Sequence, residues 1–256
     1  MTEEPVTVDP GPDARTEDLR ARLGAVQERI ERATRAAGRS DRPALIVVTK
    51  FFPIEDVLRL AELGVRDVGE NRDQEASAKA DAAAARDAGR DLRWHFIGQL
   101  QSNKARSVVR YARSVHSVDR VSLVRALGRA VAEHRPADLG PLACWVQVDL
   151  GAPAAEPATG AGHGGAAPAD LPGLADAIAG TDGLTLAGVM AVAPRGADPG
   201  PAFARLAGIA ADLRRSHPSA AGISAGMSAD LESAIAHGAT HLRVGSDVLG
   251  PRPAVG

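Results

Sequence analysis

Lysine is the rarer basic residue in this chain, and one lysine stands where its amine could act as a nucleophile. Of the 30 lysine and arginine residues, only Lys50, Lys79 and Lys104 are lysines. Lys50 closes the apolar run ALIVVTK and is followed by Phe51 and Phe52. Apolar surroundings lower the pKa of an amine and favour Schiff-base chemistry, which arginine cannot perform. The alternative is a strand-end lysine that extends to solvent.

The other two lysines have weaker claims to chemistry. Lys79 lies in the alanine-rich segment DQEASAKADAAAARDAG and is expected to be a solvated surface charge. Lys104 follows Gln101-Ser102-Asn103 at a predicted helix start, where it either lines a pocket or faces water.

Two turns near the end of the chain have chemistry that suits a phosphate. Gly226-Met227-Ser228 leads into ADLESAIAHG, and Ser228 is expected to cap that helix, whose first N–H groups can hold an anion. Asp230 would repel the anion unless it points away. The segment 243–246 supplies the cation Arg243, the hydroxyl of Ser246 and, in Gly245, a close backbone approach. A lysine amine opposite a phosphate site predicts a pocket for pyridoxal 5′-phosphate.

These residues follow predicted strands that alternate with helical segments. Eight strands with intervening helices indicate an α/β protein, a single (β/α)8 TIM barrel, which typically takes about 250 residues. A doubly wound open sheet is the alternative, but it usually has fewer strands. The strands are expected at 44–50, 65–71, 93–100, 114–119, 141–150, 184–193, 221–228 and 240–246. The helices are expected at 16–38 (with Thr16 as N-cap), 53–64, 73–89, 103–112, 121–134, 171–180, 202–215 and 229–238.

The domain organisation follows from the same pattern. Residues 1–14 are expected to be extended or disordered, and residues 15–256 to form the barrel. The Gly/Ala-rich segment 151–170 is predicted to be a flexible loop. Its glycines at 160, 162 and 165 match the spacing G-x-G-x-x-G, but a dinucleotide site needs a tight strand-to-helix connection, which this segment does not offer.

Composition excludes several classes of protein. The formal net charge of −2 over 256 residues argues against nucleic acid as a partner. No apolar run approaches the roughly 20 residues of a membrane span, and the acidic start does not resemble a signal peptide, so a cytoplasmic protein is expected. The single cysteine, Cys144, excludes an intrachain disulfide and is expected to pack inertly. No metal site is expected, since Gly238 separates His237 from His241.

Several segments together are similar to a known family. They are VVTK (47–50), VGEN (68–71), HFIGQLQSNK (95–104), GVMAV (188–192), SAGMSADLESAI (224–235) and RVGSDVLG (243–250). In this order they resemble the pyridoxal phosphate homeostasis proteins, the YggS/PROSC family, over about residues 16–250.

The resemblance implies a barrel like the N-terminal domain of alanine racemase (fold type III), with pyridoxal 5′-phosphate bound to the lysine as a Schiff base. Members bind this cofactor and buffer its free level, with no established catalytic turnover. The residues implied to bind the cofactor are Lys50 for the aldehyde, Ser228, Arg243, Gly245 and Ser246 for the phosphate, and Asn71 and Met190 for the ring.

Two positions depart from the family pattern. The family usually has tyrosine after G-E-N, whereas this chain has Arg72. The loop after the fifth strand usually carries a Ser-Lys-x-Gly element, whereas residues 151–170 contain no lysine. If that lysine helps to pass the cofactor on, this chain does so differently.

Two enzymatic alternatives remain open. An amino-acid racemase or decarboxylase of the alanine racemase type would need a second acid/base opposite the lysine, and the only tyrosine, Tyr111, is predicted at a helix end away from the strand ends. A class I aldolase would use Lys50 without cofactor and would be colourless. The expected partners are pyridoxal 5′-phosphate and the apo-enzymes that require it, with the protein acting as a monomer.

Overall fold

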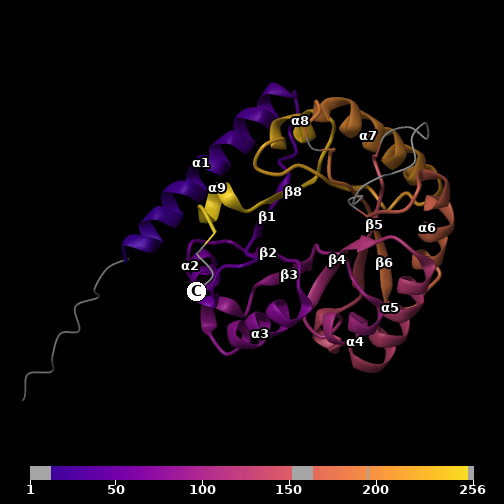
Figure 1. The fold of residues 1–256 in the computed structure, drawn as a ribbon, viewed down its shortest axis with the longest axis horizontal. Coiled ribbons are helices and arrows are strands. Elements are labelled where there is room, and N and C mark those ends of the chain that lie inside the picture. The colour runs from indigo at the N-terminus through magenta and orange to yellow at the C-terminus, as the bar shows by residue number, and fades with distance from the viewer. Residues whose placement is uncertain (1–12, 152–163, 195, 253–256) are drawn as a thin grey trace, which may run out of the picture.

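The chain forms a closed barrel of eight parallel strands with helices on its outside (Figure 1). The computed structural model describes residues 13–151, 164–194 and 196–252. The strands pair in sequence order, and the last returns to pair with the first. Their bounds are β1 Ala44–Val48, β2 Asp67–Glu70, β3 Arg93–Phe96, β4 Ala112–Val118, β5 Leu142–Gln147, β6 Leu184–Met190, β7 Gly222–Ser224 and β8 His241–Val244. The predicted (β/α)8 barrel is confirmed.

The helices surround the barrel, and the first of them precedes β1. They are α1 Ala14–Ala36, α2 Ile54–Glu62, α3 Asp73–Ala84, α4 Ala105–Val108, α5 Val121–His134, α6 Leu171–Ala179, α7 Pro199–Ser216, α8 Leu231–Ala236 and α9 Ser246–Leu249. Single 3-10 turns lie at Asp87–Gly89, Ser102–Lys104, Ala137–Leu139 and Pro168–Asp170. In Figure 1, α1 lies beside α8 and α9, and it contacts both. Within the described ranges, every helix is too short or too polar to cross a membrane.

The elements differ from the predicted ones mainly at their ends. The hydrogen-bonded ladder stops at the barrel rim although the apolar pattern continues, so β1 ends at Val48 and Lys50 lies in the turn beyond it. Helix α1 begins earlier than predicted because Asp13 is its N-cap and accepts the N–H of Thr16 at 2.7 Å. The four-residue helix α9 was not predicted. Residues 1–12 and 152–163 lie outside the described residues.

The last part of the predicted flexible loop is tied to β5. The backbone N–H of Ala166 donates to the carbonyl of Gln147, and the N–H of Asp149 donates to the carbonyl of Ala166. The side-chain amide of Gln147 also donates to the carbonyl of Gly164 at 2.8 Å. Residues 164–170 therefore form part of the barrel rim.

The two faces of the strands have opposite character. Strand residues alternate between the barrel interior and the surrounding helices. The outer faces pack in an apolar layer with the helices, which includes the fully buried Cys144, and burial raises the pKa of that thiol to about 12. The inner face is polar at its centre, where His116, Ser224 and Arg243 are buried together. Polar groups inside a barrel need hydrogen-bond partners, and Ser224 contacts both His116 and Arg243.

The turn after β1 is conformationally strained. Phe51 has φ 71°, a value that non-glycine residues rarely adopt, and it is alone in this among the described non-glycine residues. Such conformations persist only where surrounding contacts impose them. Here the N–H of Phe51 donates to Glu75 Oε1 at 2.8 Å, and the N–H of Phe52 donates to the carbonyl of Thr49 at 3.1 Å. The turn that carries Lys50 is therefore held from both sides.

Lys79 supports the same turn, so its prediction as a solvated surface charge is wrong. Helix α3 packs this lysine against the barrel rim, and only 7% of it is exposed. Its ammonium donates to the carbonyl of Thr49 at 3.0 Å, to Glu70 Oε1 at 2.8 Å and to Glu75 Oε1 at 2.7 Å. Thr49 Oγ1 also donates to Glu70 Oε1 at 2.6 Å. Burial raises the pKa of Glu70, and the Lys79 charge opposes that rise.

Replacing Lys79 by methionine tests this buried ion pair. Lys79→Met leaves the Glu70 carboxylate buried without its cation, and such losses lower the free energy of unfolding by about 3–5 kcal/mol. The carboxyl then has a higher pKa in the folded than in the unfolded chain, so it binds protons more tightly when folded and the deficit shrinks as pH falls. Urea unfolding at pH 7 and pH 5 measures both effects. Lys104→Met, at an exposed lysine, is the control; equal deficits at the two pH values would contradict the assignment.

Gly98 allows the loops after β2 and β3 to approach each other. A Cβ atom at residue 98 would overlap the carbonyl group of Asn71. Gly98→Ala is therefore expected to lower the free energy of unfolding by about 1–3 kcal/mol, as overpacking usually does. Gly208→Ala is the matched control, because nothing lies within 4 Å of its Cβ position in α7 and alanine favours helix by about 1 kcal/mol. Urea unfolding of both variants should give opposite signs.

Candidate functional site

Lys50 lies at the wall of a cavity at the carboxyl end of the strands, where barrels of this type carry their functional groups. The cavity has a volume of about 310 Å³, which is within the range of roughly 300–1,000 Å³ for small-molecule sites. Four further residues that the sequence singled out line the same cavity: Ser228, Arg243, Gly245 and Ser246. The apolar part of the wall comes from Val48, Phe51, Phe52, Ile97 and Met227.

The two loops after β7 and β8 meet at this cavity through their serines. Ser246 Oγ donates to Ser228 Oγ at 3.1 Å. The backbone N–H groups of Ser228, Ala229, Ser246 and Asp247 donate to no other residue in the described part of the chain. Hydroxyls and unpaired N–H groups that converge in this way form a cradle for an anion.

Gly245 and Arg29 fix the shape of this cradle. A Cβ atom on residue 245 would lie 3.1 Å from the carbonyl oxygen of Val48, so a side chain there would push β8 away from β1. From α1, Arg29 donates to the carbonyl of Ser228 at 3.1 Å and pairs with the Asp247 carboxylate. Arg29, which the sequence did not single out, therefore joins the loop after β7 to α9.

The predicted helix cap is different in the structure. Helix α8 begins at Leu231 with Asp230 as its N-cap, so the prediction that Ser228 caps the helix is wrong. The Asp230 carboxylate accepts the N–H of Met227 at 2.6 Å. That hydrogen bond closes a tight turn that places Ser228 before the helix start, where its hydroxyl accepts a hydrogen bond from Ser246.

Arg243 places a positive charge on the inner wall of the cavity. Its guanidinium is buried inside the barrel, where it donates to Ser224 Oγ at 2.7 Å and to the carbonyl of Ala191 at 2.9 Å. Burial lowers the pKa of this group to about 10, so it stays charged at neutral pH. Two fixed hydrogen bonds leave the other N–H groups of the guanidinium available to a ligand.

Three cations surround the ring of Phe51. Lys50 Nζ lies 5.8 Å from the ring centroid, Arg72 Cζ 5.3 Å and Arg252 Cζ 4.6 Å. Cations at these distances are attracted by an aromatic face. The ring therefore gathers positive charge at the cavity mouth, and Arg72, one of the two departures from the family pattern, is part of that cluster.

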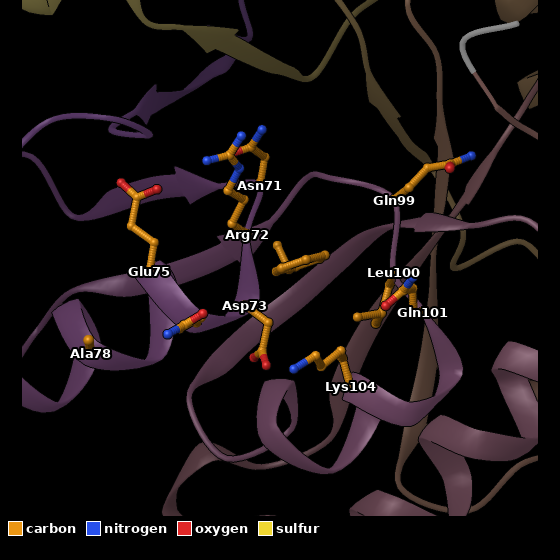
Figure 2. Close-up of a pocket in the computed structure, with 11 residues that line it drawn as sticks. Asn71, Arg72, Asp73, Glu75, Ala78, Gln99, Leu100, Gln101 and Lys104 are labelled. Carbon is orange, nitrogen blue, oxygen red and sulfur yellow. The ribbon is translucent and has the colours of Figure 1, made fainter. Parts of the chain in front are cut away.

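Asn71 lies in a neighbouring, larger cavity rather than in the one that Lys50 lines. This second cavity has a volume of about 610 Å³ and includes Asn71, Arg72, Gln99 and Lys104 (Figure 2). Asn71 Oδ1 is buried and accepts no hydrogen bond from any described residue. In Figure 2 the Lys104 side chain extends toward Asp73. The two cavities adjoin where Arg72 packs over the Phe51 ring.

Met190 and Tyr111 lie away from both of these cavity walls. Met190 is at the end of β6, buried in the barrel interior, and lines neither cavity. Tyr111 follows α4 and its hydroxyl donates to Asp73 Oδ1 at 3.3 Å. Burial raises the pKa of Tyr111, which keeps the phenol protonated. The tyrosine is therefore not placed to act on a group bound at Lys50.

The residues of the Lys50 cavity fit an aldehyde that carries a phosphate. The amine suits the carbonyl carbon, and the paired serines with their free N–H groups suit a phosphate. The positive charges of Arg243, Arg72 and Arg252 suit a ligand that is negative overall.

Comparisons with known proteins agree with this chemistry. Residues 21–253 match the family model of the alanine racemase N-terminal domain. The pyridoxal phosphate homeostasis protein of Mycobacterium tuberculosis is 43% identical over 253 residues, covering 93% of this chain and 94% of that protein. Its counterpart in Pseudomonas aeruginosa is 40% identical over 235 residues, covering 90% and 94%.

Solved structures show the same fold. PipY of Synechococcus elongatus with pyridoxal phosphate bound is 29% identical, with a TM-score of 0.71 over 91% of this chain and 100% of that chain. The alanine racemase of Corynebacterium glutamicum shares the fold alone, at 15% identity and a TM-score of 0.61 over 95% of this chain and 62% of that one. With its sequence matched over nearly its whole length, the chain belongs to the pyridoxal phosphate homeostasis protein family.

Proposed function

We propose that this chain binds pyridoxal 5′-phosphate covalently through Lys50 and thereby helps to maintain the free level of this cofactor. The observation that carries the proposal is the single cavity in which the Lys50 amine, the paired hydroxyls of Ser228 and Ser246, and the Arg243 charge meet. When bound, the cofactor supplies an aldehyde that bonds reversibly to amines. PipY, whose solved structure holds pyridoxal phosphate, supports the proposal.

Each wall of the cavity has a separate task in this proposal. Lys50 supplies the amine, and Arg72 and Arg252, which lie over the same Phe51 ring, add positive charge that attracts an anionic ligand to the cavity mouth. The serine loops orient the phosphate, and Gly245 lets β8 pack closely against Val48 of β1 beside them. Arg243 supplies a buried positive charge, and its contact with the phosphate stays a prediction. Asn71 and Met190 are proposed to shape the ring environment from the neighbouring cavity and the barrel interior.

The proposed role is storage and delivery rather than turnover. Racemisation requires a second proton donor or acceptor opposite the lysine, and Tyr111 is instead hydrogen-bonded to Asp73. We also propose that the protein acts as a monomer in the cytoplasm and passes its cofactor to apo-enzymes that need it. The residues described above as lining the cavity all come from one chain, and the buried thiol of the single cysteine, Cys144, suits a reducing compartment.

Lys50→Ala tests the covalent bond. The wild-type protein incubated with pyridoxal 5′-phosphate should absorb visible light, and borohydride reduction should attach a pyridoxyl group to the peptide that contains Lys50. The variant should lose the visible band because no amine remains in reach of the aldehyde. Lys104→Ala, which removes an amine from the adjoining cavity, should keep it. A reduced adduct on Lys79 or Lys104 alone in the wild type would refute the assignment.

The same preparation distinguishes a carrier from an enzyme. Incubation of the loaded protein with L- and D-amino acids should give no racemised or decarboxylated product. Robust turnover would favour a racemase or decarboxylase of the alanine racemase type, and a colourless protein that loses aldolase activity in Lys50→Ala would favour an aldolase.

Ser246→Ala tests the phosphate cradle. A hydrogen bond to a charged group contributes about 1.5–3 kcal/mol, so loss of this hydroxyl should raise the Kd for pyridoxal 5′-phosphate roughly 10- to 100-fold. Pyridoxal, which lacks the phosphate, is the matched ligand, and its Kd should change less than about twofold because it never used that contact. Both constants can be measured by absorbance titration. A similar loss for both ligands would place the phosphate elsewhere.

A further inference from the structure

A continuous hydrogen-bonded series of side chains crosses the interior of the barrel. The proposed function uses only its first member, Arg243. The series begins at Arg243 on the cavity wall, whose Nη1 donates to Ser224 Oγ at 2.7 Å. Ser224 Oγ lies 2.9 Å from Nδ1 of His116, although 108 residues separate the two in sequence. Arg243, Ser224 and His116 are all buried, and His116 is 0% exposed.

The hydrogen-bonded series of side chains continues to the opposite end of the barrel. His116 Nε2 lies 2.9 Å from Ser114 Oγ and 3.1 Å from Nδ1 of His95. Ser114 Oγ is 2.7 Å from the same Nδ1 of His95. His95 Nε2 then lies 2.9 Å from Oδ1 of Asp67 at the start of β2, where Arg93 also pairs with this carboxylate. The contacts therefore extend from the strand ends to the strand starts.

The two ends of this hydrogen-bonded series favour one direction for the hydrogen bonds within it. A guanidinium can only donate and a carboxylate can only accept. Ser224 accepts from Arg243 and keeps one hydroxyl proton, which we infer it donates to His116 Nδ1, so that the proton of the neutral imidazole is on Nε2. In the same direction, Ser114 donates to His95 Nδ1, and His95 Nε2–H donates to Asp67. All dipoles align from the cation toward the carboxylate, an arrangement that strengthens each bond.

The charges around His116 agree with this assignment. Burial lowers the pKa of His116 well below its usual range, and the charges of His95, Arg243 and His241 lower it further. Burial also lowers the pKa of His241 to about 4. Burial acts to raise the pKa of Asp67, but hydrogen bonds from His95 and Arg93 outweigh it and leave the pKa below its ordinary value. A neutral His116 thus lies between a charged guanidinium and a charged carboxylate.

Ring packing holds the central histidine in place. The His116 ring stacks on Trp145, with 4.8 Å between centroids and 13° between planes. His241 packs edge-on against Trp145, with 4.7 Å between the ring centroids. The Trp145 ring in turn reaches Gly222, where a Cβ atom would lie 2.5 Å from it. Stacking therefore holds the plane of the imidazole, and its Nδ1 faces Ser224.

We propose that Asp67, His95, Ser114, His116 and Ser224 form a positioning relay that orients and charge-balances Arg243 for the ligand of the Lys50 cavity. None of the five lines that cavity, so they are positioning residues that act through Arg243. Among the described residues no carboxylate contacts Arg243 directly, and the polarised chain supplies the negative end that the buried cation lacks. The effect on the ligand rests on the proposed function, whereas the relay itself does not.

The relay can be tested on the cofactor-free protein. Nitrogen-15 NMR of the histidine rings, with His116→Phe used to assign the His116 signal, should show His116 neutral with its proton on Nε2 from about pH 5 to 8. Groups facing this ring are His95, Ser224 and Arg243 in the chain, together with His241 beyond Trp145. A proton on Nδ1, or titration of His116 in that range, would overturn the proposal whether or not any cofactor binds.

A double-mutant cycle tests whether the relay acts on the ligand. Asp67→Asn removes the charge at the far end, and we expect the Kd for pyridoxal 5′-phosphate to rise about 5-fold or more. In the Ser224→Ala background, where the chain is cut next to Arg243, the same substitution should change the Kd less than about twofold. Asp176→Asn is the matched control, because Asp176 contacts His217 at 3.0 Å outside the barrel and should have no effect in either background.

The outcomes of the cycle are distinct. Equal effects of Asp67→Asn in both backgrounds would show that Asp67 acts on the fold rather than through Ser224, and would refute the relay. No effect in the wild-type background would refute it as well. A wild-type protein that binds no pyridoxal 5′-phosphate would refute the proposed function, and the NMR measurement would still decide whether the relay exists. Circular dichroism of each variant verifies that it is folded before its Kd is compared.

Discussion

The pairing of the last strand with the first is the constraint on which the site depends. Val47 of β1 pairs with Val244 of β8, so the residues that follow them leave the barrel side by side. Lys50 comes three residues after one partner and Ser246 two residues after the other. An open sheet would place β1 and β8 apart and would separate the amine from the serine loops. Closure of the barrel is therefore what turns two distant sequence motifs into one cavity.

The fold also buries charged side chains, and it satisfies them in two ways. At the rim, Lys79 meets two carboxylates directly, and the ion pair holds the strained turn at Phe51. In the interior, Arg243 has no direct carboxylate among the described residues and contacts Ser224 and a backbone carbonyl instead. A buried charge lowers the stability of the fold unless hydrogen bonds or an opposite charge satisfy it. The buried charges of Lys79 and Arg243 therefore serve to hold the residues around the Lys50 cavity in one geometry more than to stabilise the fold.

The sequence predicted the barrel, the lysine and the serine loops because each has a local signature. Apolar runs mark the strands, and a lysine that ends such a run is conspicuous where arginine is otherwise the usual cation. The placement of Lys79 was not predictable in this way, since α3 is alanine-rich and its polar face differs little from its buried one. The hydrogen bonds between the buried histidines and serines could not be predicted for another reason. His116 and Ser224 meet only across the closed barrel, and no short-range sequence pattern links them.

Arg72 departs from the family pattern but still makes a contact with the Phe51 ring. A tyrosine at this position would offer an aromatic ring beside Phe51, whereas the arginine places its guanidinium 5.3 Å from the centroid of that ring. A guanidinium is attracted to an aromatic face, so the arginine also has a contact with Phe51 and adds a positive charge. That charge stands at the boundary between the Lys50 cavity and the larger cavity that holds Asn71 and Lys104. A ligand with a phosphate dianion would meet an attractive field on this path. Arginine at this position thus adds positive charge beside the cavity, and a guanidinium does not supply the second proton-transfer group that racemisation requires.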